Sequence, residues 1–334
     1  MTLLADVFNS NIFESRTLTA AIELLPAAPG RIGQMGLFQP APVGTTTLVV
    51  EERQGVLRLL PSKKRGAPAN LHDTEKRKAR AFVIPHIPYE DQVLADDILN
   101  VRQFGSNELI PGVSTVVNDK LVSMKQDFEV TEEFLKIGAV KGIIIDGDGA
   151  TTLYNLFTEF ELEQTTVDFA MNDPETSIRL KCLAVKRAIE SALGATPYAT
   201  VHCLCGQTFF EQLISHPDVA AAYERWNQGE MLRNDPRKGF AFADIVFEEY
   251  VGNVSGTAYI GTNDAHFFPV GVPGLFKIHY APGNFTEAVG TLGKRLYALS
   301  ENLPLDAGRR LHVQSNPLPM CMRPGVLVKS TYVP

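Results

Sequence analysis

The sequence predicts an α+β protein, and three observations lead to that class. Apolar residues recur at helical spacing mainly between 89 and 137 and between 174 and 226, whereas strand-like runs dominate the front of the chain and the stretch from 240 onward. A chain of 334 residues exceeds what one small core needs, so we expect two or three compact regions. Apolar residues make up 45% and charged residues 21%, which is ordinary for a folded protein and argues against a disordered one.

The first eighty-five residues predict an extended arm, a hairpin and a further strand. Residues 1–35 mix apolar groups with prolines and are expected to form a short helix followed by an arm. Gly55 separates the β-branched run 45–52 from the apolar run 56–60, a pattern typical of a hairpin. The stretch 81–85 predicts the next strand.

The middle of the chain predicts helices interrupted by one tight hairpin. Helical spacing predicts helices over 89–104 and 116–137. Two apolar runs flank the Asp-Gly-Asp-Gly sequence within 142–154, which predicts a hairpin. A helix is expected to start at Pro174, with Asp173 as its cap, and to end at Gly194.

The second half predicts short strands around two further helices. Helices are expected over 208–215 and 219–226, divided by Pro217. Short runs of strand-forming residues are expected at 201–205, 240–242, 245–247, 257–260, 276–280 and 326–328.

Positive charge is concentrated in residues 51–80. This window holds nine lysines and arginines against four acids, a net charge of +5, so the remainder of a chain of net charge −7 carries −12. A charged stretch of this kind is usually a solvated loop, but its cations could also reach phosphates or an acidic neighbour. Aromatic residues are absent between 45 and 80, which argues against single-strand recognition by base stacking. A ribbon lying over an adjacent subunit fits this pattern better.

No motif in the chain predicts catalysis, a metal site or a cofactor. The Asp-Gly-Asp-Gly stretch at 146–149 lacks the later ligands of a calcium loop. The stretch 290–295 has two residues between its glycines instead of four, and Arg295 stands where a phosphate loop needs Ser or Thr. Histidines and cysteines form no zinc-type pairs, and the four cysteines are expected to be reduced and structural. We therefore predict that the protein is not an enzyme.

The chain carries no run of apolar residues long enough to span a membrane, and its first residues lack the basic start of a signal peptide. We therefore expect no membrane partner and a cytoplasmic site of synthesis.

Four features taken in order resemble the lambda-type (protein E family) major capsid proteins of tailed bacteriophages. They are the basic ribbon, the amphipathic helix within 115–138, the 142–154 hairpin and the tail 315–329, which carries Asn-Pro-Leu-Pro and then Val-Leu-Val. The resemblance implies the capsid-subunit fold shared by tailed-phage and herpesvirus major capsid proteins. It also implies an order of regions: an N-terminal arm at 1–40, an extended loop at 41–80, a discontinuous peripheral domain at 81–164 and 286–334, and an axial domain at 165–285.

The function implied by this resemblance is self-assembly into hexamers and pentamers of an icosahedral head shell around double-stranded DNA. Its partners would be further copies of the chain, with a scaffolding protein, a decoration protein and the portal as additional candidates, and packaged DNA bound without sequence specificity. The expected location is the virion capsid, with assembly in the host cytoplasm. No covalent cross-link between subunits is expected.

The residues expected to make contacts between subunits are the cations of the extended loop: Arg53, Arg58, Lys63, Lys64 and Arg65. One alternative is a nucleic-acid-binding protein that uses the same basic segment, 53–80, and it predicts salt-sensitive DNA binding. A hydrolase with a site not visible in the sequence is another, and it predicts converging His and carboxylate groups.

Overall fold

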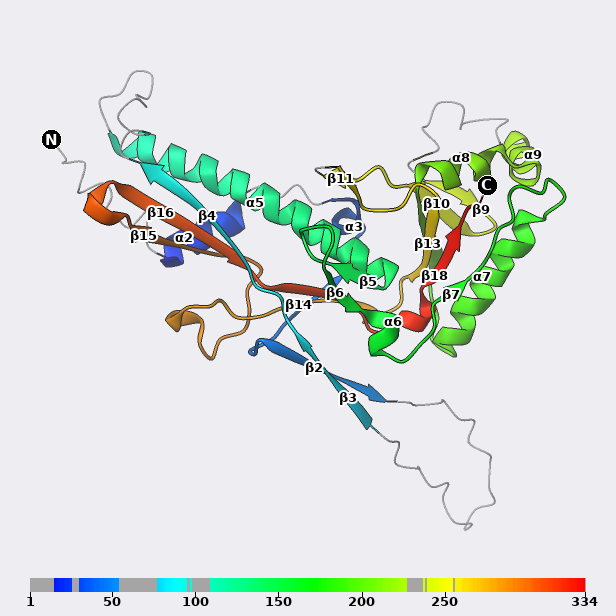
Figure 1. Cartoon of the computed structure of the whole chain (residues 1–334), viewed down its shortest axis with the longest axis horizontal. Helices are drawn as coiled ribbons and strands as arrows, with labels where there is room; N and C mark the ends of the chain where they lie inside the picture. The colour runs from blue at the N-terminus through cyan, green and yellow to red at the C-terminus, as the bar shows by residue number, and fades with distance from the viewer. Residues whose placement is uncertain are drawn as a thin grey trace, which may run out of the picture. The chain divides into compact units, whose positions relative to one another are not determined.

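The computed structural model describes residues 15–25, 30–53, 77–94, 97, 109–226, 237, 239–254 and 256–333 (Figure 1). The chain divides into two compact units, each assembled from three stretches of sequence. Unit 1 comprises Met1–Leu48, Phe82–Leu135 and Lys277–Pro319, and unit 2 comprises Val49–Ala81, Lys136–Phe276 and Met320–Pro334. Helix α5 (Leu109–Lys141) contributes residues to both units.

Unit 1 is built around a three-stranded antiparallel sheet and the long helix α5. The strands lie in the order β15–β16–β4 and have the bounds Tyr297–Asn302, Gly308–Ser315 and Ile87–Leu94. Helix α2 (Ser15–Leu24) contacts β15. Its Leu18 and Ile22 lie one turn apart on the same face of the helix, and both are buried. The shared core also contains Val93, Leu121, Met124, Phe128, Ala298, Leu311 and Val313.

A second sheet of unit 1 involves the arm that follows α2. Its order is β1–β14–β17, with bounds Gln39–Pro42, Phe276–Tyr280 and Pro317–Cys321. Strand β1 runs parallel to β14, and His279 on β14 also contacts the Ala41 carbonyl through Nδ1 at 3.1 Å. The short helix α3 (Arg31–Gln34) precedes β1. The 3₁₀ turns Thr286–Ala288 (η4) and Pro304–Asp306 (η5) connect β14 to β15 and β15 to β16.

Unit 2 contains a mixed six-stranded sheet into which the C-terminal segment is inserted. The order is β7–β18–β13–β8–β10–β9, with bounds Thr165–Thr166, Val328–Thr331, Asp264–Val270, Thr200–Cys205, Ile245–Glu249 and Phe240–Phe242. Strand β18 pairs antiparallel with β13 and parallel with β7, so the last strand of the chain is an interior strand. The turn η6 (Pro324–Val326) leads into it.

Three helices lie beside this sheet (Figure 1), and phenylalanine rings, several of them on its strands, pack in its core. The helices are α7 (Ile178–Leu193), α8 (Gln207–Ser215) and α9 (Pro217–Trp226). Helix α7 contacts β13 and β18, and α8 contacts β10. Phe267 on β13 stacks on Phe169 at 5.5 Å between ring centroids and meets Phe247 edge-on at 5.9 Å. Strands β8, β10 and β13 are buried along almost their whole length. Their phenylalanine rings therefore lie in the core of unit 2.

Smaller elements complete unit 2. Gly142 ends α5 with a positive φ of 82°, where a Cβ atom would lie 2.3 Å from the ring of Phe157. The hairpin β5–β6 (Ile143–Ile145 and Thr152–Asn155) follows, and Asn155 caps α6 (Leu156–Glu159) by accepting from the Phe157 N–H at 3.1 Å. The remaining pairs are β2 with β3 (Thr47–Arg53 and Arg77–Val83) and β11 with β12 (Asn253–Val254 and Thr257–Ala258).

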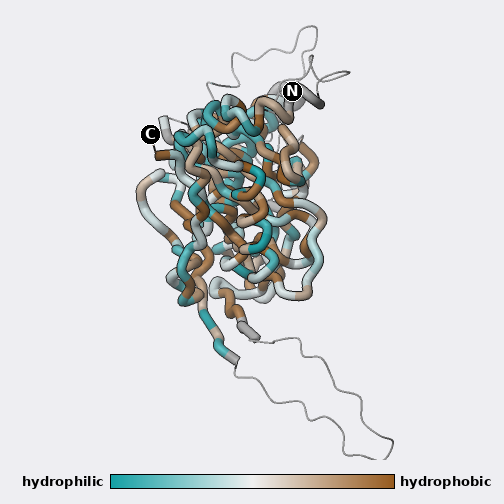
Figure 2. The backbone as a smooth tube through the Cα atoms, turned by 90° about the vertical axis from the view of Figure 1, so that its right-hand side faces the viewer, coloured by the Kyte–Doolittle hydropathy of each residue, from teal (hydrophilic) through white to brown (hydrophobic). Residues whose placement is uncertain are grey.

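In Figure 2 hydrophobic and hydrophilic stretches alternate along the backbone. Among the residues that the structure describes, no helix combines the length and the apolar composition needed to cross a membrane. The four cysteines are free and buried, and burial raises the pKa of the Cys182 and Cys321 thiols to about 12.

The α+β class is confirmed, and so are most of the expected elements. Helix α5 covers the expected 116–137 helix and extends it at both ends. The hairpin around the Asp-Gly-Asp-Gly stretch forms, with Asp148 accepting the Ala150 and Thr151 N–H groups at 2.8 Å. Strands β8, β9, β10 and β14 and helices α8 and α9 lie where the sequence predicts them.

Several expectations were wrong. The expected helix at 89–104 begins instead as strand β4, because pairing with β16 buries Val93 on a sheet. The strand that pairs with β2 is β3, whereas the expected partner run 56–60 lies outside the described residues. Helix α7 starts at Ile178 after Ser177, four residues later than Pro174. Strands β13, β15 and β16 were not expected.

Candidate assembly site

The structure places one of the five expected contact residues. Arg53 is the last residue of β2, in the two-stranded pair with β3. Arg58, Lys63, Lys64 and Arg65 lie outside the described residues. Their role in contacts between subunits therefore stays a prediction.

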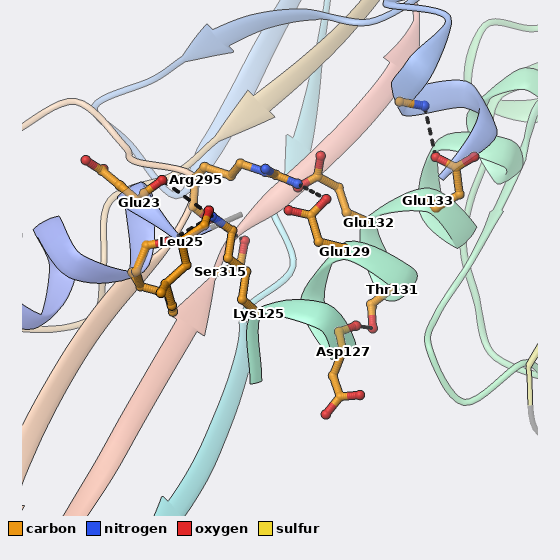
Figure 3. Close-up of polar contacts among 12 residues, drawn as sticks. Glu23, Leu25, Lys125, Asp127, Glu129, Thr131, Glu132, Glu133, Arg295 and Ser315 are labelled. Atoms are coloured by element: carbon orange, nitrogen blue, oxygen red, sulfur yellow. Dashed lines mark hydrogen bonds and ion pairs between the residues drawn. The ribbon is translucent and has the colours of Figure 1, made fainter. Parts of the chain in front are cut away.

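The described part of unit 1 contains a polar cluster that the sequence did not predict. Four charged residues of α5 lie at helical spacing in a charged stretch, which would normally face solvent, yet each is only 4–5% exposed. They are Lys125, Glu129, Glu132 and Glu133. Figure 3 shows these side chains together with Arg295 and the end of α2. Buried charges of this kind are stable only when they are paired or hydrogen-bonded.

Lys125 binds the C-terminal end of helix α2. Its ammonium donates to the carbonyls of Ile22 at 2.8 Å and Leu25 at 2.7 Å, with a longer contact to Glu23 at 3.4 Å. The last carbonyls of a helix have no partner within the helix and carry partial negative charge, so a cation there is favourable. Burial lowers the pKa of Lys125, and the Glu129 carboxylate opposes that change.

Arg295 joins two carboxylates of α5. Its NH2 lies 2.8 Å from Glu129 Oε2, and its Nε donates to Glu132 Oε2, also at 2.8 Å. Tyr280 donates its hydroxyl to Glu132 Oε1 at 3.3 Å. Burial alone lowers the pKa of Arg295, but the two carboxylates outweigh it and hold the pKa above its ordinary value. Arg295 belongs to the stretch 290–295, whose glycines resemble those of a phosphate loop. Its guanidinium instead binds two carboxylates within unit 1.

Glu133 caps helix α3. Its Oε1 accepts the Ile32 N–H at 2.5 Å and its Oε2 accepts the Gly33 N–H at 3.1 Å. A carboxylate at a helix N-terminus satisfies backbone donors that otherwise have no partner. A Cβ atom on Gly30 would lie 2.3 Å from the Glu133 carboxyl group, so a larger residue there would displace the Glu133 side chain from this position.

Together these contacts fasten the N-terminal arm to α5 at two points, through Lys125 on α2 and Glu133 on α3. A third contact joins Thr19 to β15, where its hydroxyl both donates to the Ala298 carbonyl and accepts the Ala298 N–H at 3.1 Å. Each described acid in the cluster has a structural partner. Within the described residues no three His, Cys, Asp or Glu side chains gather in a way that could hold a metal ion.

A charged stripe on a helix normally indicates a solvated face, which is why the sequence did not reveal this cluster. The available signal was that the four charges, at i, i+4, i+7 and i+8, share one face of an amphipathic helix. Only the packing of the arm and β15 shows that these charges are inside.

Solved structures of similar shape identify the fold. A phage-related protein from Bordetella bronchiseptica RB50 matches with a TM-score of 0.51 at 14% identity, covering 96% of this chain and 97% of that one. The capsid of an empty GTA particle matches with a TM-score of 0.52 at 11% identity, covering 93% of each chain. The capsid of Myoviridae phage XM1 matches with a TM-score of 0.50 at 8% identity, covering 100% and 99%. The protein therefore has the capsid-subunit fold of tailed phages.

Sequence relatives give the family. The family described as phage major capsid protein E matches residues 14–332, so the chain belongs to that family. The major capsid protein of Pseudomonas phage KPP10 is 27% identical, over 96% of this chain and 97% of that protein. The major capsid protein of Salmonella phage Felix O1 (isolate Felix O1-VT1) is 26% identical, over 93% and 94%.

Proposed function

We propose that this protein builds the icosahedral head of a tailed bacteriophage by self-assembling into hexamers and pentamers around double-stranded DNA. The observation that carries the proposal is the family match over residues 14–332, with relatives of nearly full coverage that are major capsid proteins. A closed shell needs each subunit to contact several neighbours, and such contacts are made by surfaces and projections.

The ribbon β2–β3 and the loop beyond it are the proposed contact between subunits. Arg53, Arg58, Lys63, Lys64 and Arg65 are the cations that would meet acids on a neighbouring copy. A net charge of −12 outside the basic window supplies complementary partners on every copy. The proposed regions remain the arm at 1–40, the extended loop at 41–80, the peripheral domain at 81–164 and 286–334, and the axial domain at 165–285.

The protein acts in this proposal by contact and without catalysis. Assembly would take place in the host cytoplasm, with a scaffolding protein, a decoration protein and the portal as further partners. DNA would meet the inner face without sequence specificity, which suits a chain of acidic net charge. Neither the family nor its relatives favour the alternative of a dedicated nucleic-acid-binding protein.

The test reverses charge in the loop. We expect the triple variant Lys63→Glu, Lys64→Glu, Arg65→Glu to lose shells, scored by electron microscopy and light scattering, while the circular dichroism of the subunit stays unchanged. A matched triple to Gln removes the charge without reversing it and should give an intermediate yield. Normal shells from the Glu triple would remove this loop from the mechanism. Salt-dependent DNA binding by the subunit, lost in the same triple, would favour the alternative.

A further inference from the structure

The described base of the β2–β3 ribbon carries a contact that has no role so far. Lys78 and Arg80 are two residues apart on β3 and therefore point to the same face of the strand. Both belong to unit 2, as does the short helix α6 with the two residues that follow it.

The Glu161 carboxylate forms ion pairs with both Lys78 and Arg80. Its Oε2 accepts from Lys78 Nζ at 2.7 Å, and its Oε1 lies 3.7 Å from Arg80 NH2. The hydrogen bond and the charge of Lys78 lower the pKa of the Glu161 carboxyl, so it is ionised near neutral pH. Both side chains of the Lys78–Glu161 pair are exposed, by 50% and 66%, and a single surface pair of this kind contributes little by itself.

Phe160 adds a third contact next to the carboxylate. The guanidinium carbon of Arg80 lies 5.0 Å from the centroid of the Phe160 ring. The Arg80 side chain is only 12% exposed and Phe160 is 7% exposed, so this cation–π contact is largely shielded from water. Two consecutive residues after α6 therefore hold two alternate residues of β3.

The backbone at Glu161 is unusual for a residue with a side chain. Its φ is 56°, in the left-handed region that favours glycine. The surrounding hydrogen bonds, Glu161 N–H to the Thr158 carbonyl at 3.1 Å and Leu162 N–H to the Phe157 carbonyl at 2.8 Å, form the standard C-terminal closure of a helix. A glycine would meet the needs of this turn more easily, but it would supply no carboxylate.

We propose that Glu161 is a positioning residue for assembly: it holds the base of β3 so that the ribbon is presented to a neighbouring copy in one direction. This inference rests on the proposed function of the ribbon. Fixing the base before contact reduces the conformational freedom that would otherwise be lost when subunits meet. Any change of angle at the base is also amplified along the ribbon, since each strand residue adds about 3.3 Å of length.

The direct test measures the base of the ribbon in the unassembled full-length subunit. We expect Glu161→Gln to raise the hydrogen-exchange rates of the amides of residues 78–83 roughly 2- to 5-fold. The matched control is Glu159→Gln, two residues earlier on the exposed face of α6, which should leave these rates unchanged. Unchanged exchange in Glu161→Gln would overturn the proposal.

The second readout is shell yield, compared with the loop triple variant. We expect Glu161→Gln to lower the yield several-fold while the subunit keeps its thermal unfolding midpoint, and Glu159→Gln to assemble normally. If the loop triple abolishes shells and Glu161→Gln assembles normally, the positioning role is wrong and the proposed function stands. If the loop triple assembles normally, the proposed contact of the ribbon is wrong, and the positioning role falls with it.

Discussion

Replacing Lys125 by Met should loosen the N-terminal arm. The substitution keeps the length and the apolar stem of the side chain and removes the ammonium that binds the carbonyls of Ile22 and Leu25. Helix α2 then keeps its apolar contacts through Leu18 and Ile22 but loses its polar attachment to α5.

The magnitude follows from two opposing contributions. Hydrogen bonds to a charged group contribute about 1.5–3 kcal/mol each, and two short ones are lost. Burying the ammonium costs part of that gain, as the lowered pKa of Lys125 indicates, and Met removes this cost. We therefore expect a net loss of about 2 kcal/mol in the free energy that holds the arm closed, or about 30-fold in its opening equilibrium.

Hydrogen exchange measures this opening directly. The amides of α2 should exchange about 30-fold faster in Lys125→Met, whereas the six-stranded sheet of unit 2 should be unaffected. The control is Lys120→Met on the same helix, because the Lys120 ammonium pairs with Asp91 on β4 at 3.1 Å and not with the end of α2. An increase of less than about threefold for Lys125→Met would refute the view that this ammonium fastens the arm.

Three further perturbations test the two units. Arg295→Met should lower the free energy of unfolding of unit 1 by about 3–5 kcal/mol in urea unfolding, since it leaves the buried carboxylates of Glu129 and Glu132 without their cation. Adding Glu129→Gln and Glu132→Gln to this variant should recover part of the loss. A triple variant as unstable as Arg295→Met alone would contradict this explanation. Phe267→Ala should cost about 3–5 kcal/mol in unit 2, measured the same way, because it empties the centre of the phenylalanine cluster. Burial, with the Lys141 ammonium adding to it, lowers the pKa of His266 to about 3 from an ordinary 6.5, against the opposing Asp264 carboxylate. Between pH 6.5 and 3, His266 is therefore protonated in the unfolded state and neutral in the folded state. The free energy of unfolding should fall as the pH drops through this range, by up to about 3 kcal/mol at pH 4.5. His266→Gln should show a smaller acid loss between pH 7 and pH 4.5, and an identical pH profile would exclude His266 as the cause.

Local patterns in the sequence were sufficient for most helices and for the tight hairpin. Helix α5 and hairpin β5–β6 depend on contacts between residues close in the chain, and those contacts are visible as spacing and turn residues. The family resemblance likewise rested on the order of such elements, and the match over residues 14–332 confirms it.

Patterns failed where partners lie far away in the chain. The segment 89–104 has helical spacing at its start, yet β16, more than two hundred residues later, pairs with residues 87–94 and makes them strand β4. The strand expected at 81–85 is present as part of β3, but its pairing with β2, with residues 54–76 between them in the sequence, was not expected. Pairing between strands satisfies backbone groups and buries one face, and it outweighs a modest helical preference.

The sequence by itself determined the α+β class, the main helices, the uneven charge and the family of this protein. Only the tertiary structure decided that charges on α5 are buried, that Arg295 joins two of them, and that Glu161 binds the base of β3. Spacing along one helix tells which side chains share a face, but not what covers that face. Whether a charge is solvated or paired depends on segments distant in sequence, and folding alone brings those segments together.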